Sequence, residues 1–376
     1  MKSTRTIVGV AIGAVLAVAT LSQSSRAGAG PAIALTVVAD HLQNPRGLAM
    51  SADGRLFVAQ AGDYTGSLTS SNTSGKITEI RAPAGTHPIV RDVATGLVSV
   101  FDPQGETLGL SGLSTDPDGN IFAIVAESNI GSGISPSLLG HLLRVTRSGK
   151  VIDQANVGDH DYRWTEAHQA LAPNDFAPGD SNPYAVLADG DDLYVADAGA
   201  NTLSVVHPDG QQQILAFFPN SALRVGGVTY DATPTCIAKG PDGALYVGTL
   251  SLIPSIVFGP SAVVYRVDPR RAQPNDLSRV LSLATPWATG LWPIGGCTFD
   301  HEGNFYGTEL ITNSGFSGGD VVKIPFAQPA THVSLTTPGS LQFPAGVAVS
   351  VEGSVYVVNK STMNPGAGQV LRLRDR

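Results

Sequence analysis

The feature that most constrains this chain is a hairpin pattern that occurs six times. In each copy an apolar run, usually opened by proline, ends at an Asp-Gly or Glu-Gly turn, and a second apolar run with an aromatic residue follows at once. The six aromatic residues lie 50 to 72 residues apart and are Phe57, Phe122, Tyr194, Tyr246, Tyr306 and Tyr356. A repeat of this kind cannot bury its own faces, so successive copies must pack on one another.

The repeat predicts an all-β fold, a six-bladed β-propeller. A four-stranded blade needs about 40 to 50 residues, so the surplus belongs to loops. Third strands are expected at residues 75–80, 142–145, 202–206, 263–267, 321–324 and 370–373, and fourth strands at residues such as 213–216 and 279–282. A β-sandwich is the main alternative, but it gives no reason for the same hairpin to recur.

The two ends of the chain complement each other. The last copy stops after its third strand, while residues 34–38 form an apolar run before the first copy and have no partner strands of their own. Pairing this N-terminal strand with the last blade would close the ring and leave only short sheet edges.

The first 29 residues are typical of a secretory signal peptide. Lys2 and Arg5 precede an apolar stretch at residues 7–21, and a cleavage-like Ala27-Gly28-Ala29 follows. A membrane anchor is the alternative, but about 15 residues span only about 22 Å as a helix, short of the roughly 30 Å hydrocarbon core. We therefore expect residues 30–376 to form the propeller in the periplasm or outside the cell, without stable membrane insertion once the signal is removed.

The composition limits the classes of partner that this chain is expected to bind. The chain has 31 acidic residues against 23 Lys plus Arg, a net charge of -8, and no basic run. Nucleic acid and anionic membrane surfaces are therefore excluded as expected partners, which leaves a small molecule or another exported protein. No P-loop, dinucleotide fingerprint, Gly-x-Ser-x-Gly elbow or Cys/His metal spacing occurs.

The long loops should gather on one face of the ring. Because blade strands alternate in direction, the start of the first strand and the end of the second open on the same side, called here the upper face. Its loops at residues 61–74, 127–140, 251–261, 311–318 and 360–368 are long, and most are rich in Gly and Ser, whereas the Asp-Gly turns opposite are tight. Binding residues usually sit on such loops, so the upper face is the expected functional face.

Residues 180–184 with 194–203, and residues 234–250 with 265–267, carry a family resemblance. In these segments the chain resembles the ScyD/ScyE family, and the likeness extends over nearly the whole mature region. The resemblance implies an exported NHL-like propeller from a family named after scytonemin pigment gene clusters, and it brings no established reaction. More distantly the chain is similar to gluconolactonase-like and virginiamycin B lyase-like propellers, whose chemistry is metal-assisted.

Polar residues recur where second strands end at the upper face. Three residues past the aromatic marker, five of the six copies are polar, and further polar residues precede the first strands; the candidate ligand-binding set is Asn44, Gln60, Asp180, Asn182, Asp197, Glu309 and Asn359. Carboxylate and amide oxygens suit Ca²⁺ or Mg²⁺. The alternative is that these side chains cap loop amides.

The metal-assisted propellers imply a convergent Glu, Asn and Asp. Glu309, Asn182 and Asp197 are the candidate metal ligands here, with an open position for water or substrate. Trp292 and Phe343 precede prolines at the expected channel mouth and suggest an aromatic ligand; burial between blades is the alternative. The expected function is binding of a small metabolite at the channel mouth in secondary-metabolite processing. The alternatives are a cation-dependent hydrolase or lyase and a protein-interaction scaffold.

Three further segments receive structural interpretations. Residues 159–168 hold two histidines and several carboxylates, but we expect a short helix packed over the ring, because the histidines lack the four-residue spacing of helical zinc pairs. Residues 116–120 resemble a calcium loop but fit a hairpin turn. Cys236 and Cys297 lie in first strands of neighbouring copies in registers that differ by one residue, so they face each other or point directly away. A disulfide and two separate buried thiols both remain open.

Overall fold

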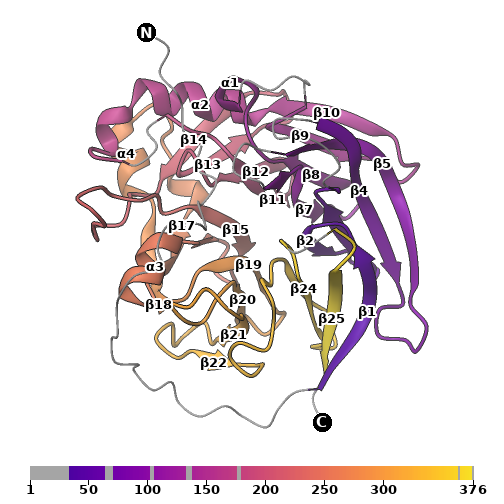
Figure 1. The fold of residues 1–376 in the computed structure, drawn as a ribbon. Coiled ribbons are helices and arrows are strands. Elements are labelled where there is room, and N and C mark those ends of the chain that lie inside the picture. Colours follow the sequence, from indigo (N-terminus) through magenta and orange to yellow (C-terminus); the bar gives the residue numbers. More distant parts are fainter. Residues whose placement is uncertain are drawn as a thin grey trace.

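The computed structural model describes residues 34–63, 71–101, 106–132, 138–175, 179–362 and 365–374. In these ranges the chain forms six antiparallel sheets arranged as a β-propeller, which Figure 1 shows around a centre occupied by the first strand of each blade. The predicted fold class is confirmed. The expected signal peptide, residues 1–29, lies outside the described residues.

Five blades follow the chain in simple order. Blade 1 contains β2 (Pro45–Met50), β3 (Leu56–Gln60), β4 (Ser71–Arg81), β5 (Ile89–Phe101) and the short β6 (Thr107–Leu108). Blade 2 contains β7 (Leu110–Thr115), β8 (Ile121–Val125), β9 (His141–Val145) and β10 (Val151–Asn156). Blade 3 contains β11 (Pro183–Asp189), β12 (Asp192–Asp197), β13 (Thr202–Val206) and β14 (Gln212–Phe217). Blade 4 contains β15 (Pro234–Lys239), β16 (Leu245–Thr249), β17 (Ala262–Val267) and β18 (Thr285–Leu291), and blade 5 contains β19 (Ile294–Phe299), β20 (Phe305–Glu309), β21 (Asp320–Ile324) and β22 (Val333–Ser334).

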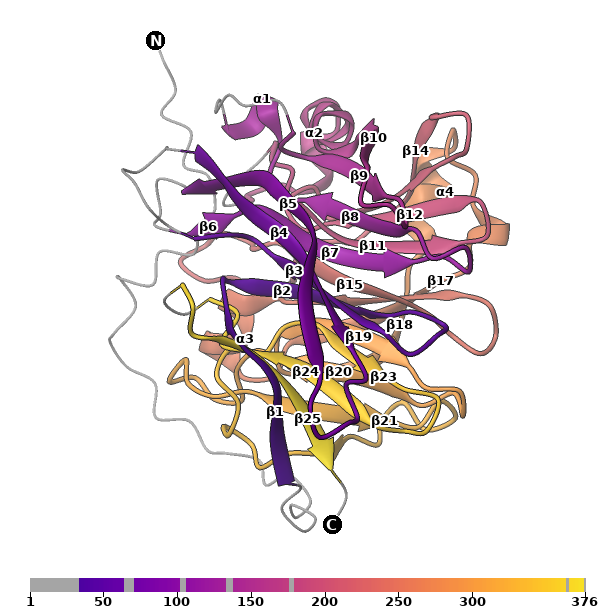
Figure 2. The ribbon, with the colours of Figure 1, turned by 90° about the vertical axis from the view of Figure 1, so that its right-hand side faces the viewer.

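The sixth blade joins the two ends of the chain. It contains β23 (Val347–Val349), β24 (Val355–Asn359) and β25 (Gly368–Arg374), and β1 (Ala34–Leu42) adds as its outer strand. The antiparallel register pairs Leu35 with Leu373 and Val37 with Leu371, so the predicted closure of the ring is confirmed. Figure 2 shows β1 and β25 side by side.

The repeated aromatic residue explains why the blades pack. Each one belongs to a hydrophobic cluster shared with the next blade: Phe57 packs with Leu113 of blade 2, and Tyr246 with Phe305 of blade 5. In the last cluster, Tyr356 of blade 6 meets Leu48 of blade 1. The core is therefore six seams between blades, and a buried aromatic is among the largest contributors of apolar area at each seam.

Helices lie in the connections. They are α1 (Asn129–Ser132), α2 (Val157–Ala167), α3 (Leu252–Phe258), α4 (Leu277–Ser282) and the 3₁₀ turns η1 (Gln169–Leu171) and η2 (Pro269–Arg271). The expected helix over residues 159–168 is α2, and Trp164 and Leu171 pack against the β14 cluster of Phe217. Within the described residues, none of the helices has the length and apolar character needed to span a bilayer.

One strand prediction was wrong. Residues 279–282 belong to α4, and the fourth strand of blade 4 is β18 instead. Asp276 caps the helix by accepting from the N–H groups of Ser278 and Arg279, and apolar residues at 277, 280 and 281 have helical spacing. The 251–261 loop likewise holds the short helix α3.

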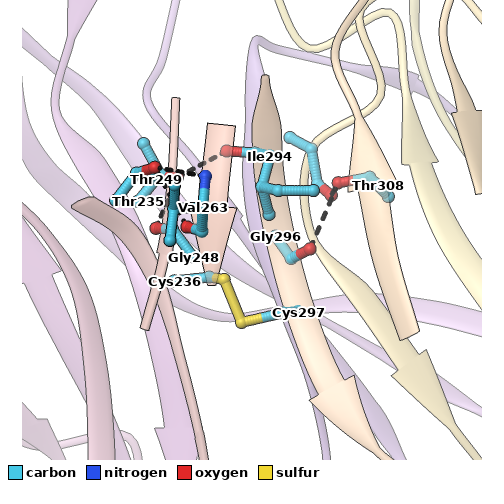
Figure 3. The surroundings of a disulfide bond; sticks show 10 residues. Thr235, Cys236, Gly248, Thr249, Val263, Ile294, Gly296, Cys297 and Thr308 are labelled. Carbon is cyan, nitrogen blue, oxygen red and sulfur yellow. Dashed lines mark hydrogen bonds between the residues drawn. A yellow bond between two sulfur atoms is a disulfide. The ribbon is translucent and has the colours of Figure 1, made fainter. Parts of the chain in front are cut away.

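The hairpin interpretation of residues 116–120 is confirmed, and the structure answers the question that the sequence left open for the two cysteines. The carboxylate of Asp116 accepts from the backbone and side-chain amides of Asn120, which closes the β7–β8 hairpin turn. Cys236 of β15 and Cys297 of β19 face each other across the seam of blades 4 and 5 and form a disulfide, with 5.6 Å between their Cα atoms (Figure 3).

Candidate functional site

A cavity lies on the axis of the ring at the upper ends of the innermost strands. It has about 410 Å³ of empty space, including the part open to solvent. Every blade contributes the residues that directly follow the start of its first strand: Arg46 to Leu48, Ser111 to Leu113, Tyr184 to Val186, Thr235 to Ile237, Gly295 to Cys297, and Gly346 with Val347. Backbone atoms and side chains that range from glycine to Arg46 and Tyr184 therefore line the cavity.

Glycine keeps this centre narrow. A Cβ added at Gly112 would lie 2.7 Å from the Cα atom of Ala185, and one added at Gly296 would lie 2.7 Å from the carbonyl oxygen of Ala345. Real Cβ atoms do not approach other atoms so closely, so glycine lets neighbouring first strands touch.

Arg46 is the one charged side chain among the described residues that line the cavity. It lies on β2, is partly buried, and donates from Nη2 to the carbonyl oxygen of Thr107 at 3.2 Å. In the described part of the chain it has no carboxylate partner. Tyr184, Ser111 and Thr235 also belong to the lining. The hydroxyl of Ser111 donates to the carbonyl oxygen of Gly109, and that of Thr235 donates to the carbonyl oxygen of Ile294, as Figure 3 shows.

Of the five polar residues at the ends of second strands, Thr249 bonds to the backbone of Val263 on the third strand, and the other four share one contact. Each accepts a hydrogen bond from a backbone N–H close before the first strand of the same blade. The contacts run from Gln43 to Gln60 Oε1 (2.6 Å), from Asn182 to Asp197 Oδ1 (2.7 Å), from Trp292 to Glu309 Oε1 (3.1 Å) and from Gln342 to Asn359 Oδ1 (2.7 Å). This repeated contact ties the upper end of strand two to the upper end of strand one, as the capping alternative expects.

Asp197 is the most heavily used of these groups. Its carboxylate accepts from the N–H groups of Asn182, Gly199 and Ala200 and from the hydroxyl of Ser181. The side chain is fully buried. Burial, and then the charge of Asp161, raise the pKa of Asp197 to about 8, against the effect of these donors.

The three candidate metal ligands come from two blades that are not neighbours. Asn182 and Asp197 lie together in blade 3, where Asn182 Oδ1 also accepts from the N–H of Glu127 at 3.0 Å. Glu309 lies in blade 5, with blade 4 between them. Among the described residues there is also no group of three His, Cys, Asp or Glu side chains suited to a metal ion. Each of the three side chains accepts a hydrogen bond from a backbone N–H group, and we derive no chemical step through a cation.

Asp180 belongs to a second, smaller pocket on the upper face. This pocket lies between α2 and the upper loops of blades 3 and 4, with Asp175, Asp231, Trp164 and His168 among its lining. Burial raises the pKa of Asp180 to about 6, with the charge of Asp175 adding to the effect. Burial and the charges of Asp175 and Asp180 also raise the pKa of Asp231 well above its usual range.

The remaining predicted residues lie in connections that lead into first strands. Asn44 is buried, has a φ of 45°, and donates from Nδ2 to the carbonyl oxygen of Gly62 at 2.9 Å. Trp292 and Phe343 are partly buried, and the ring of Phe343 lies 5.5 Å from that of Phe316. Both therefore retain exposed surface in the loops of blades 4 to 6.

Sequence reasoning missed Arg46. A signal was present, since alignment of the copies on their leading proline places Arg46 opposite Tyr184, Thr235, Ile294 and Ala345. The other four copies have an uncharged residue at this position, so the arginine is an exception to the repeat. The prediction attended to the ends of second strands, whereas the axis is lined by the starts of first strands.

The fold and site define a six-bladed propeller with a narrow axial cavity, and the chain is similar in structure to known propellers. These include a virginiamycin B lyase from Staphylococcus aureus, with a TM-score of 0.50, 13% identity, and coverage of 91% of this chain and 100% of that one. A putative oxidoreductase (glucose dehydrogenase) from Thermus thermophilus has a TM-score of 0.51 and 16% identity, with coverage of 91% of this chain and 100% of that one. A gluconolactonase from Xanthomonas campestris has a TM-score of 0.51 and 12% identity, with coverage of 91% of this chain and 90% of that one.

These identities show the fold alone. The structural neighbours are six-bladed propellers of the gluconolactonase and virginiamycin B lyase type. No protein-family model matches the sequence, and no curated protein matches it.

Proposed function

We propose that this protein is an exported ligand-binding propeller that takes a small metabolite at the upper mouth of its central channel. The observation that carries the proposal is the axial cavity, to which all six blades contribute. A site built from six first strands is held rigidly by the ring, and rigid, concave sites are where small ligands bind.

The surroundings suit a ligand with a polar head and an apolar body. Arg46, Ser111 and Tyr184 are polar residues of the cavity lining, while Trp292 and Phe343 lie in connections that lead into β19 and β23 and are partly exposed. An aromatic or amphipathic metabolite matches this division. The resemblance to the ScyD/ScyE family supports a role in secondary-metabolite processing outside the cytoplasm.

The named neighbours include lyases and a gluconolactonase, which makes a cation-dependent hydrolase or lyase the main alternative. Such an enzyme needs acidic or imidazole ligands at its metal. The cationic side chain of Arg46 in the lining of the axial cavity supports a function in which the cavity takes a ligand rather than a metal ion.

Affinity selection with native mass spectrometry tests the proposal. The mature protein would be incubated with a library of small metabolites, charged and neutral, with and without a chelator. We expect bound molecules that survive chelation and that crystal structures locate in the axial cavity. The proposal fails if the library yields no bound molecule, if the bound molecules lie elsewhere, or if the protein converts them only when a cation is present.

A further inference from the structure

We infer that the axial cavity takes an anionic group, a carboxylate or a comparably small oxyanion, with Arg46 as its counter-charge. This inference rests on the proposed function and names the chemical class of its ligand. The rest of the ligand would lie above the cavity, among the upper loops.

The charge of Arg46 is the first reason. A guanidinium that is partly removed from water is costly unless an anion or several acceptors compensate it. The described surroundings of Arg46 supply one carbonyl oxygen, that of Thr107, and no carboxylate. The net charge of the whole chain is -8, so a lone cation at the axis stands out against an acidic protein.

The donors of Arg46 are the second reason. A guanidinium has five N–H donors in a fork that matches the two oxygens of a carboxylate. The contact to Thr107 occupies Nη2 and leaves donors for a ligand. Tyr184 and Ser111 belong to the same lining, and the hydroxyl of Ser111 donates to the carbonyl oxygen of Gly109 at 3.4 Å.

The third reason is the arrangement of the first strands. β2, β7, β11, β15, β19 and β23 are each an edge strand of their sheet, and all six edges turn toward the axis. Backbone groups on such an edge that no strand pairs can donate to a ligand. The close contacts at Gly112 and Gly296 keep neighbouring first strands together, so these edges lie side by side around the axis.

A structural role for Arg46 is the competing explanation, because its contact to Thr107 ties β2 to β6. The variant Arg46→Gln separates the two roles, since glutamine keeps an N–H donor but has no charge. Arg224→Gln is the matched control, because Arg224 is exposed in the loop after β14 and does not line the cavity. Circular dichroism and thermal unfolding would confirm that both variants fold.

The experiment is calorimetric titration of the mature protein and both variants with paired probes: benzoate against benzamide, and acetate against acetamide. Each pair differs in charge and hardly in size. We expect the anions to bind wild-type protein and Arg224→Gln alike, and to bind Arg46→Gln about ten-fold or more weakly. The neutral amides should bind wild-type protein about ten-fold or more weakly than the anions.

Two results would overturn the inference. If the amides bind as tightly as the anions in the axial cavity, the metabolite-binding proposal stands and the anionic class is wrong. If folded Arg46→Gln binds benzoate as wild-type protein does, Arg46 is not the counter-charge. Failure of the metabolite library described above is a separate result, which would remove the proposed function itself.

Discussion

The backbone N–H of Asn182 donates to the carboxylate of Asp197 at 2.7 Å and holds the start of β11 against the end of β12. Asp197 also accepts from Ser181, Gly199 and Ala200, so one side chain organises the upper end of blade 3. Substitution Asp197→Ala leaves these donors buried without an acceptor. We expect it to lower the free energy of unfolding by about 3 kcal/mol or more.

Urea denaturation would measure this effect. Asp197→Asn keeps an oxygen at the site and should cost less than Asp197→Ala. Asp209→Asn, at an exposed turn between β13 and β14, is the control and should stay within about 0.5 kcal/mol of wild type. Equal stability of Asp197→Ala and wild type would contradict the structural role.

The disulfide between Cys236 and Cys297 joins the first strands of blades 4 and 5 and closes a segment with a sequence separation of 61 residues. Restricting a loop of that length in the unfolded chain stabilises the folded state by about 4 kcal/mol in the chain-entropy model, and measured values are often smaller. We expect reduction to lower the unfolding temperature by several degrees while the propeller fold remains. The double variant Cys236→Ala with Cys297→Ala should unfold at the same temperature as the reduced wild-type protein, and reductant should not change that temperature. An unchanged temperature on reduction would be the contrary result.

The fold could be predicted from sequence because the repeat encodes it directly. Phe57 and its five counterparts mark the seams, and the unpartnered strand at residues 34–38 marks the closure. Residues 279–282 could not be assigned by apolar content alone, because a short apolar run does not separate strand from helix. The capping contacts of Asp276 decide that segment.

The site was harder to predict for a geometric reason. A repeat shows which positions are polar, but it does not show whether an oxygen faces solvent or a neighbouring amide. Gln60, Asp197, Glu309 and Asn359 have the pattern of a ligand ring, and the structure turns each of them toward a backbone N–H. The register of the two cysteines showed that they point to opposite sheet faces. It did not show whether these two faces meet between blades 4 and 5, as they do in the structure.

The half-buried carboxylates beside α2 should make the stability of the protein depend on pH. The pKa of Asp180 is raised to about 6, so the folded state binds its proton more tightly than the unfolded state does. The stabilising contribution of the bound proton is therefore complete below the usual pKa of about 4. It is lost as the pH rises from about 4 to above 6. Asp180→Asn removes this titration, so we expect a flatter profile between pH 4 and 6 and a gain in stability at pH 7.

Chemical denaturation at a series of pH values would check this dependence, with Asp209→Asn as a carboxylate control outside the pocket. A profile of Asp180→Asn that runs parallel to that of wild type would show that Asp180 is not held in its protonated form. Asp197, with a pKa raised to about 8, should extend the decline toward pH 8 in both proteins.

Two adjacent residues test the closing strand. Val38 of β1 is 7% exposed and packs in the seam between blades 6 and 1, whereas Val37 is 50% exposed on the other face of the same strand. Val38→Asp places a carboxylate in an apolar seam, and we expect a loss of about 3 kcal/mol or more. Val37→Asp keeps the strand and the charge but faces water, so it should cost about 1 kcal/mol or less. Because both substitutions have the same chemistry and nearly the same position in the chain, their difference measures burial of β1 against the ring. Equal, small effects in urea denaturation would mean that β1 does not close the propeller in solution, and the axial cavity would then lack the rigid ring on which its binding role depends.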